Sequence, residues 1–230
     1  MKATFIGLYE IEKFGIKDLV ELLKFYGFDT VYLEYEVFFF FSEFKDFKKV
    51  LWVHCLDSCV RVVRDVLSCF TFDGVLLDGI RCMDEDFGVK GILKSISIAY
   101  LVKEYGEMVN EFGTELEVCF KCEDYVSVFS SEVNRLFWGV SIWMIKSCVS
   151  KILLMTYHDE YNVSIDRVSD IVRGLRVFHK TNKIVPIWQT YKDNPKVDYN
   201  ILWSDVKKES KNFKDKVFFR FGTCDLETFK

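Results

Sequence analysis

Short apolar segments alternate with amphipathic segments along most of this chain of 230 residues. The first apolar segment covers residues 3–9, and residues 15–25 follow it with apolar side chains at helical spacing. Gly27 then stands where helices commonly end on a glycine. Because the same order of strand and helix is repeated to the end of the sequence, we predict an α/β fold in a single domain covering residues 1–230.

The predicted strands are short and rich in large apolar residues, and most lack the alternation of apolar and polar residues seen when one face of a sheet meets solvent. After residues 3–9 they cover residues 30–34, 50–55, 74–78, 115–121, 151–157, 184–189 and 217–221. The helices predicted between them cover residues 15–25, 42–48, 58–70, 89–112, 125–147 (one helix or two, around Gly139), 164–179 and 199–213.

Eight strands that alternate with helices imply parallel strands joined by right-handed crossovers, and eight strands close a TIM barrel. Dividing 230 residues by eight gives about 29 residues per strand and helix, close to the minimum for such a unit. The alternative, an open doubly wound sheet, needs a glycine-rich turn after its first strand, and residues 8–15 (LYEIEKFG) do not form one. We therefore predict a compact (β/α)8 TIM barrel.

The composition favours a soluble protein without nucleic-acid or membrane partners. Half of the residues are hydrophobic and 29% are charged, too apolar for a disordered chain and too charged for a membrane protein. The net charge of -4 argues against a surface for nucleic acid. The longest charge-free apolar stretch, residues 136–145, is about half of the roughly 20 residues that span a bilayer. The first residues lack the features of a signal peptide, so a cytoplasmic location is expected, and the oligomeric state is left open.

The eight cysteines are spread along the chain rather than framing a small domain. Cys119 and Cys122 have CxxC spacing, but no second pair supplies two further zinc ligands. Most cysteines are therefore expected in the core as small apolar residues. The chain also lacks a phosphate-binding loop and a serine-hydrolase elbow, and we expect neither a metal nor another cofactor.

Active residues of a TIM barrel lie at or just after the carboxyl ends of its strands. These ends bring carboxylates, histidines and aromatic residues to one mouth here, and Tyr157 and Trp188 have ring faces suited to a sugar. The residues expected to bind substrate are Glu34, Glu36, His54, Arg81, Tyr157, His158, Trp188, Gln189 and Arg220.

Asp78 is the most informative of the strand-end residues, because it ends the apolar run GVLLD, where a carboxylate has no role in solubility. It could instead cap the following loop or pair with Arg81. Glu123 follows the next strand, so its carboxylate is placed to approach Asp78 across the mouth. Two carboxylates on neighbouring strand ends are what the hydrolysis of a glycosidic bond requires.

Three segments resemble strands of TIM-barrel glycoside hydrolases. Residues 72–81 (FDGVLLDGIR) are similar to the fourth strand of the chitinase and polygalactosaminidase-like families, residues 151–158 (KILLMTYH) to the sixth, and residues 185–191 (VPIWQTY) to the seventh. They cover about 25 residues and stand in the order found in those families. The resemblance implies a carbohydrate substrate and the hydrolysis of a polysaccharide or glycoconjugate.

The polygalactosaminidase-like pattern fits better than the chitinase pattern. The chitinase motif DGxDxDxE would place acidic residues where this chain has Leu76 and Ile80. The other family has a single aspartate ending strand four and a glutamate ending strand five. Carried over, the resemblance implies Asp78 as nucleophile or base and Glu123 as general acid.

Two other functions stay open. His54, Asp57 and His158 could hold a divalent metal that activates water, as in deacetylases or phosphodiesterases built on barrels. The barrel could also bind carbohydrate without catalysis, since a fold alone does not determine function. Residues 38–41 (FFFF) form either a buried loop or an exposed patch for a partner.

Overall fold

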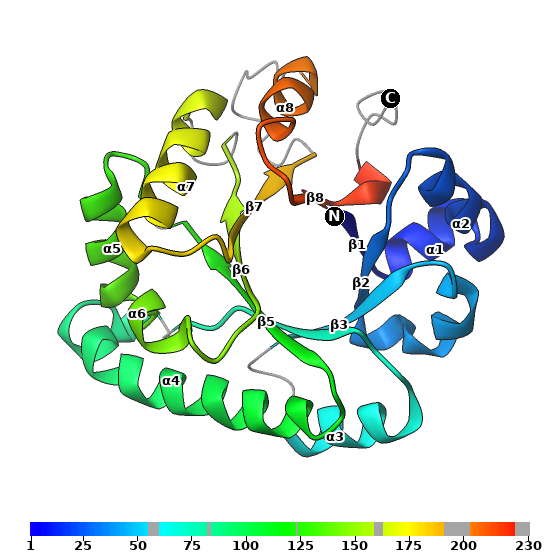
Figure 1. The fold of residues 1–230 in the computed structure, drawn as a ribbon, viewed down its shortest axis with the longest axis horizontal. Coiled ribbons are helices and arrows are strands. Elements are labelled where there is room, and N and C mark those ends of the chain that lie inside the picture. Colours follow the sequence, from blue (N-terminus) through cyan, green and yellow to red (C-terminus); the bar gives the residue numbers. More distant parts are fainter. Residues whose placement is uncertain (55–59, 82–83, 123, 159–162, 191–202, 224–230) are drawn as a thin grey trace.

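The computed structural model describes residues 1–54, 60–81, 84–122, 124–158, 163–190 and 203–223 of the chain. Eight parallel strands form a closed barrel in which β1 pairs with both β2 and β8 (Figure 1). This arrangement confirms the predicted (β/α)8 TIM barrel. The strands are β1 (Lys2–Ile6), β2 (Thr30–Glu34), β3 (Lys48–His54), β4 (Gly74–Asp78), β5 (Glu115–Lys121), β6 (Lys151–Thr156), β7 (Ile184–Gln189) and β8 (Lys216–Phe219).

Helices surround the barrel as an outer layer (Figure 1). The α-helices are α1 (Leu8–Phe14), α2 (Ile16–Phe25), α3 (Val60–Cys69), α4 (Val89–Asn110), α5 (Val128–Phe137), α6 (Ile142–Ile145), α7 (Ile165–His179) and α8 (Trp203–Ser210). The 3-10 helices are η1 (Tyr35–Phe44), η2 (Asp84–Asp86) and η3 (Phe221–Thr223). None of the helices in the described part of the chain is long and apolar enough to cross a bilayer.

Two predicted elements differ from the structure. The first strand ends at Ile6 rather than continuing to residue 9, because α1 begins at Leu8. The carboxylate of Glu10 accepts a hydrogen bond of 2.9 Å from the Gly7 N–H, which satisfies a donor at the start of that helix. The helix predicted over residues 42–48 is replaced by η1 and by the start of β3.

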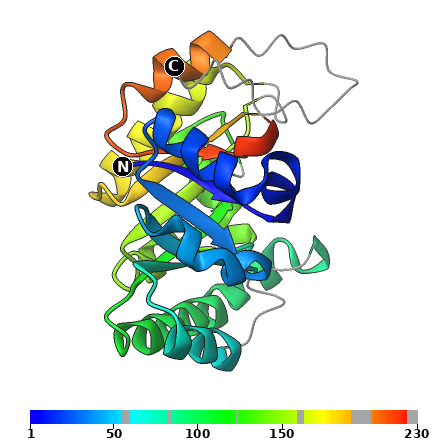
Figure 2. The ribbon, with the colours of Figure 1, turned by 90° about the vertical axis from the view of Figure 1, so that its right-hand side faces the viewer.

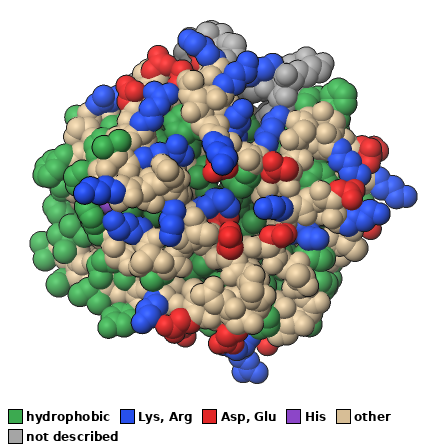
Figure 3. Space-filling model, in the orientation of Figure 1, with side chains coloured by type: hydrophobic (Ala, Val, Ile, Leu, Met, Phe, Trp, Pro, Cys, Tyr) green, Lys and Arg blue, Asp and Glu red, His purple; other side chains and the backbone are tan. Residues whose placement is uncertain are grey.

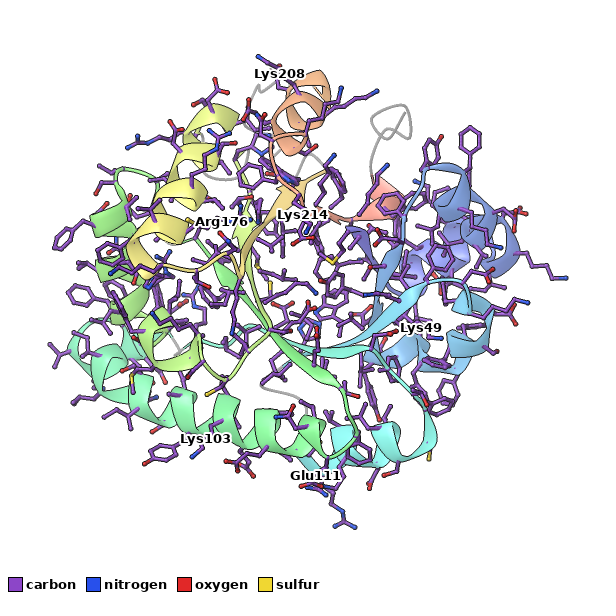
Figure 4. The ribbon with its side chains drawn as sticks, in the orientation of Figure 1. Lys49, Lys103, Glu111, Arg176, Lys208 and Lys214 are labelled. Carbon is purple, nitrogen blue, oxygen red and sulfur yellow. The ribbon has the colours of Figure 1, made fainter. Side chains whose placement is uncertain are left out.

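The barrel interior and the layer under the helices are separate apolar clusters. Successive side chains of a strand point to opposite faces, so each strand contributes alternately to the two clusters. The inner cluster contains Ala3, Phe5, Tyr32, Val50, Trp52, Leu76, Cys119, Leu153, Tyr157, Val185, Ile187 and Val217. Figure 4 shows side chains filling the centre of the ring, so the barrel is a packed core rather than a pore.

A buried polar group lies inside the barrel near the amino ends of the strands. Tyr32 donates a hydrogen bond of 2.7 Å to Glu117, and the Lys151 ammonium pairs with the second oxygen of the same carboxylate. The amino ends of the strands face the viewer in Figures 1, 3 and 4. Lys49 and Lys214, labelled in Figure 4, lie at this end of the barrel. Charged side chains surround the barrel axis there, as Figure 3 shows. The strands run from left to right in Figure 2, so the carboxyl ends that form the mouth lie on the right.

The run of four phenylalanines, residues 38–41, lies in η1 and is mostly packed against the protein. Phe38 contacts Phe70 of the segment after α3, with 5.4 Å between ring centroids, and Phe41 contacts Phe72 at 4.8 Å. Phe39 is the one residue of the four whose side chain is mostly exposed to solvent. The buried-loop interpretation therefore describes most of this segment.

We predict that Gly91→Ala destabilises the protein although alanine favours helices. Gly91 lies on α4 directly against the carbonyl group of Phe137, which an added Cβ would overlap. Alanine normally stabilises a helix by about 1 kcal/mol over glycine, whereas forced overpacking costs about 1 to 3 kcal/mol. Urea denaturation should therefore show a net loss of about 1 kcal/mol, and Ser97→Ala on the exposed side of α4 should change the free energy of unfolding by less than about 0.5 kcal/mol. A stabilised Gly91→Ala variant would contradict the close contact.

Candidate functional site

Three inward-facing side chains lie side by side at the carboxyl end of the barrel. The strand register pairs His54 of β3 with Asp78 of β4, and Asp78 with Cys119 of β5. Paired positions on neighbouring strands point to the same face of a sheet. Asp78 therefore lies between an imidazole and a thiol at the base of the mouth.

Asp78 is 7% exposed and its carboxylate is held from one side. The indole N–H of Trp52 donates a hydrogen bond of 2.9 Å to Oδ2, while Oδ1 is buried without a hydrogen-bond partner among the described residues. Burial raises the pKa of Asp78, and the Trp52 hydrogen bond and the nearby His54 oppose that rise. The same burial, together with Asp78 itself, raises the pKa of the Cys119 thiol.

His54 lies between two carboxylates. Its Nε2 is 3.7 Å from Glu34 Oε1 and its Nδ1 is 3.9 Å from Asp78 Oδ2. Both distances exceed an ordinary hydrogen bond, so these contacts are electrostatic. Nearly half of the His54 side chain is exposed, whereas Asp78 beneath it is buried. His54 thus lies above Asp78 on the solvent side of the mouth.

A second polar group joins both ends of the chain next to Glu34. The Arg220 Nε donates a hydrogen bond of 2.7 Å to the fully buried carboxylate of Glu10. A Cβ at Gly7 would overlap both the Glu34 carboxylate and the Arg220 guanidinium, so these two groups converge on the space that a glycine leaves open. Gly7, between β1 and α1, therefore lets an acidic and a basic group meet at the mouth.

Aromatic rings form an apolar floor beneath these polar groups. Phe219 of β8 is partly buried, and its ring lies 5.1 Å from Phe5, 6.1 Å from Trp52 and 5.9 Å from Tyr157 between centroids. The Tyr157 and Phe219 rings are nearly parallel, with 27° between their planes. We call these four residues the aromatic floor. A floor of this kind beside polar groups is typical of sites for small ligands.

No protein-family model matches the sequence, and no curated protein sequence matches it. Solved structures do match its fold. The fold is similar to that of glycoside hydrolase barrels. The glycoside hydrolase domain of PgaB (BpsB) from Bordetella bronchiseptica superimposes with a TM-score of 0.71 at 10% identity, covering 95% of this chain and 93% of that one.

Two further barrels agree with this comparison. The Group IV chitinase of Ostrinia furnacalis, in complex with allosamidin, matches with a TM-score of 0.62 and 11% identity over 97% of this chain and 92% of that one. The spore cortex-lytic enzyme SleL of Bacillus megaterium matches with a TM-score of 0.61 and 9% identity over 99% and 72%. At these identities the matches establish the shared fold alone.

Trp188 does not join the mouth, contrary to the sequence-based expectation of a sugar platform. It is fully buried, and its ring packs 5.5 Å from Phe213 in the layer under the helices. Alternation along β7 explains the placement, because Trp188 stands between the inward position of Ile187 and that of Gln189. Gln189, the last residue of β7, is itself fully buried.

Arg81 and Glu36 also lie apart from Asp78. Arg81 forms a 2.9 Å ion pair with Asp84, and its guanidinium lies 3.6 Å above the centre of the Trp138 ring. This pairing replaces the Arg81–Asp78 contact that the sequence left possible. Glu36 is exposed in η1, two residues beyond the end of β2.

His158 is buried just after β6, three strands away from His54 around the barrel. Its Nδ1 has no hydrogen-bond partner in the described part of the chain, and burial lowers the pKa of His158 to about 4. The carboxylate that opposes this lowering of the His158 pKa is that of Asp205 on α8 rather than that of Asp78. The two histidines therefore do not share one site.

Within the described residues no group of three or more histidine, cysteine, aspartate or glutamate side chains could hold a metal ion. Cys119 of β5 belongs to the barrel interior, whereas Cys122, directly after β5, belongs to the outer layer, so the two thiols of the CxxC pair lie in different clusters. Asp57, named for the metal alternative, and Glu123, named as general acid, lie outside the described residues.

Sequence reasoning missed the roles of Trp52 and Glu10. Trp52 stands two residues before His54 on β3 and so shares its inward face, a signal that the continuous apolar run VLWVH obscures. Glu10 follows Gly7 by three residues, the spacing at which an acidic side chain caps the start of a helix. Its contact with Arg220 joins residues 210 positions apart and carries no local signal.

We predict that His158 makes the fold sensitive to mild acid. An unfolded histidine gains its proton near pH 6.5, whereas the folded His158 gains it only near pH 4. The unfolded state thus binds more protons between these values, and stability falls as the pH drops, by about 2 kcal/mol at pH 5. Urea denaturation at pH 7 and pH 5 should show that the free energy of unfolding falls by about 2 kcal/mol less in His158→Gln than in the wild type. Equal decreases in both proteins would contradict the lowered pKa.

Proposed function

We propose that this protein is a glycoside hydrolase that acts on a polysaccharide or glycoconjugate through Asp78. The observation that carries the proposal is a buried carboxylate at the base of the barrel mouth, held by the Trp52 indole and facing an aromatic floor. The active sites of TIM-barrel enzymes lie at this end of the barrel. The fold shared with the PgaB glycoside hydrolase domain and with chitinases supports the choice of reaction.

The environment of Asp78 suits a group that accepts a proton or attacks an electrophilic carbon. Burial raises its pKa and makes it a stronger base than an exposed carboxylate, while the Trp52 N–H limits that rise. The carboxylate lies at the base of the mouth beneath the half-exposed His54, so a sugar or a water molecule would approach it from that side. Asp78 is therefore proposed as the base or nucleophile.

Glu123 is proposed as the general acid. It follows β5, the strand next to β4, and stands two positions after the last strand residue, Lys121. Carboxyl groups about 5 to 5.5 Å apart characterise retaining glycosidases, and groups about 6.5 to 9.5 Å apart characterise inverting ones. The pairing rests on the position of Glu123 in the chain and on the resemblance of the sequence to polygalactosaminidase-like barrels.

The rest of the mouth supplies groups that a sugar can use. Phe219, the partly buried member of the aromatic floor, offers apolar ring surface on which the C–H face of a pyranose can pack, and the buried Tyr157 ring supports it from below. Glu34, His54 and Arg220 are partly exposed above that floor and can exchange hydrogen bonds with hydroxyl groups. Apolar surface with a few polar groups around it is the usual design of a ligand site.

The proposal predicts that Asp78→Asn abolishes most hydrolysis while the protein stays folded. Asparagine keeps an oxygen to accept the Trp52 hydrogen bond but cannot act as a base, so kcat should fall by about 100-fold or more. A panel of polysaccharides with release of reducing ends as readout tests this, and Asp84→Asn is the control because Asp84 is exposed on η2. Equal hydrolysis by wild type and Asp78→Asn would remove Asp78 from catalysis, and glycan binding without any hydrolysis by the wild type would favour a binding barrel.

A second prediction concerns Trp52, which positions Asp78. Trp52→Phe keeps a ring against Phe5 but removes the N–H that lowers the pKa of Asp78. Losing a hydrogen bond to a charged group raises the pKa of Asp78 further, so the acidic limb of the pH–rate profile should move to higher pH. Trp188→Phe makes the same chemical change outside the barrel and should leave the limb in place. An unshifted limb in Trp52→Phe would show that Asp78 is not the group that titrates.

A further inference from the structure

The longest helix of the described chain carries an apolar seam on its solvent side. Val89, Leu93, Ile96 and Tyr100 of α4 are 73%, 67%, 52% and 71% exposed. Their spacing of four, three and four residues places them in one row along the helix. This is the spacing by which one helix packs against another.

The seam is not part of the core. The buried face of α4 carries other residues, including Gly91, Ser95, Val102 and Tyr105, and packs toward the strands. Lys103, labelled in Figure 4, lies beyond α4 on the side away from the barrel. The helix thus has two apolar faces, of which the barrel uses one.

Neighbouring segments enlarge this outer surface. Phe87, which directly precedes α4, is 46% exposed, and Trp143 and Met144 of α6 are 53% and 41% exposed. Because α6 packs against α4, these side chains lie on a neighbouring element, where the Trp143 ring also contacts Phe178 of α7. Figure 3 shows hydrophobic side chains gathered along the left margin, over the beginning of α4 and over α5 and α6.

The exposed area matches what a stable dimer needs. A fully exposed side chain of these types presents roughly 100 to 250 Å² of apolar surface, so the seven together expose on the order of 600 Å². A standard interface buries about 800 Å² on each partner, of which about 60% is apolar. The surface also reaches the upper end of the roughly 300 to 600 Å² found for the largest patches on monomers.

We propose that the outer face of α4 is the interface of a twofold symmetric dimer, with α4 of one copy antiparallel to α4 of the other. A twofold axis between Leu93 and Ile96 sets each of these residues opposite the other in the partner copy. The same axis places the small Val89 opposite the large Tyr100, so the row complements itself in size. The flanking Lys90 and Lys94 already pair with Asp86 of their own chain, so association does not require an outside acidic partner.

Sedimentation equilibrium of the full chain, from about 1 µM to about 100 µM, tests this proposal over a wide range of affinity. The wild type should sediment as a dimer, at twice the 27.2 kDa of one chain. Leu93→Glu should weaken association by about 100-fold or more, because an unpaired charge would be buried at the centre of the seam. Phe25→Glu is the matched control, since Phe25 is 72% exposed on α2, away from α4, and this variant should stay dimeric.

A second variant removes unfolding as an explanation. Val89 is the first residue of α4, where an acidic side chain interacts favourably with the helix dipole. Val89→Glu should therefore disrupt the dimer without destabilising the helix. Far-UV circular dichroism below the melting transition should show the same helical spectrum for both α4 variants as for the wild type, because losing the dimer removes only the stabilisation that association supplies. A monomeric wild type across the concentration range, a dimer that survives Leu93→Glu, or a monomer that binds anionic lipid vesicles through Leu93 would each overturn the proposal.

Discussion

Closure of the eight-stranded barrel is the constraint on which the candidate site depends. Once β8 pairs with β1, every strand has two neighbours, and only alternate residues can point inward. Those residues fill the interior, so the last inward-facing residue of each strand lies at the mouth. His54 and Asp78 occupy such positions on adjacent strands, and their contact follows from register rather than from any local motif.

The same constraint explains which parts of the fold and site could be predicted. Strands buried on both faces give continuous apolar runs, so all eight were visible in the sequence, and so was the anomaly of a carboxylate ending GVLLD. Continuous runs hide the alternation, however, and a list of strand-end residues mixes both faces. Trp188 was selected although it points outward, and Trp52 was overlooked although it points inward beside Asp78. The helix at residues 8–14 was missed because its first turn continues the apolar composition of β1.

Charge in the mouth depends on contacts that no local pattern reveals. Glu10 is fully buried, a state that a carboxylate tolerates only when it is paired and hydrogen-bonded. Arg220 supplies the charge, and the Gly7 and Gly222 N–H groups supply hydrogen bonds, so residues from both ends of the chain neutralise one buried acid. This pairing fixes Arg220 beside Glu34 on one side of Asp78. The electrostatic character of the site is therefore set by the β1–β8 closure as much as by the strand that carries Asp78.

The surface of α4 and the mouth are connected through the segment that follows β4. Asp86 pairs with Lys94 in the second turn of α4. The Gly88 N–H donates a hydrogen bond of 3.0 Å to the carbonyl of Phe137. These contacts tie the start of α4 to α5 and to the end of the loop that leaves Asp78. Because close-packed interiors have low compressibility and transmit strain, a partner bound to the seam would act on the barrel through this segment. Association on α4 would thus stabilise the segment that follows β4, whereas the pairing of β3 with β4 that places Asp78 beside His54 belongs to the barrel itself.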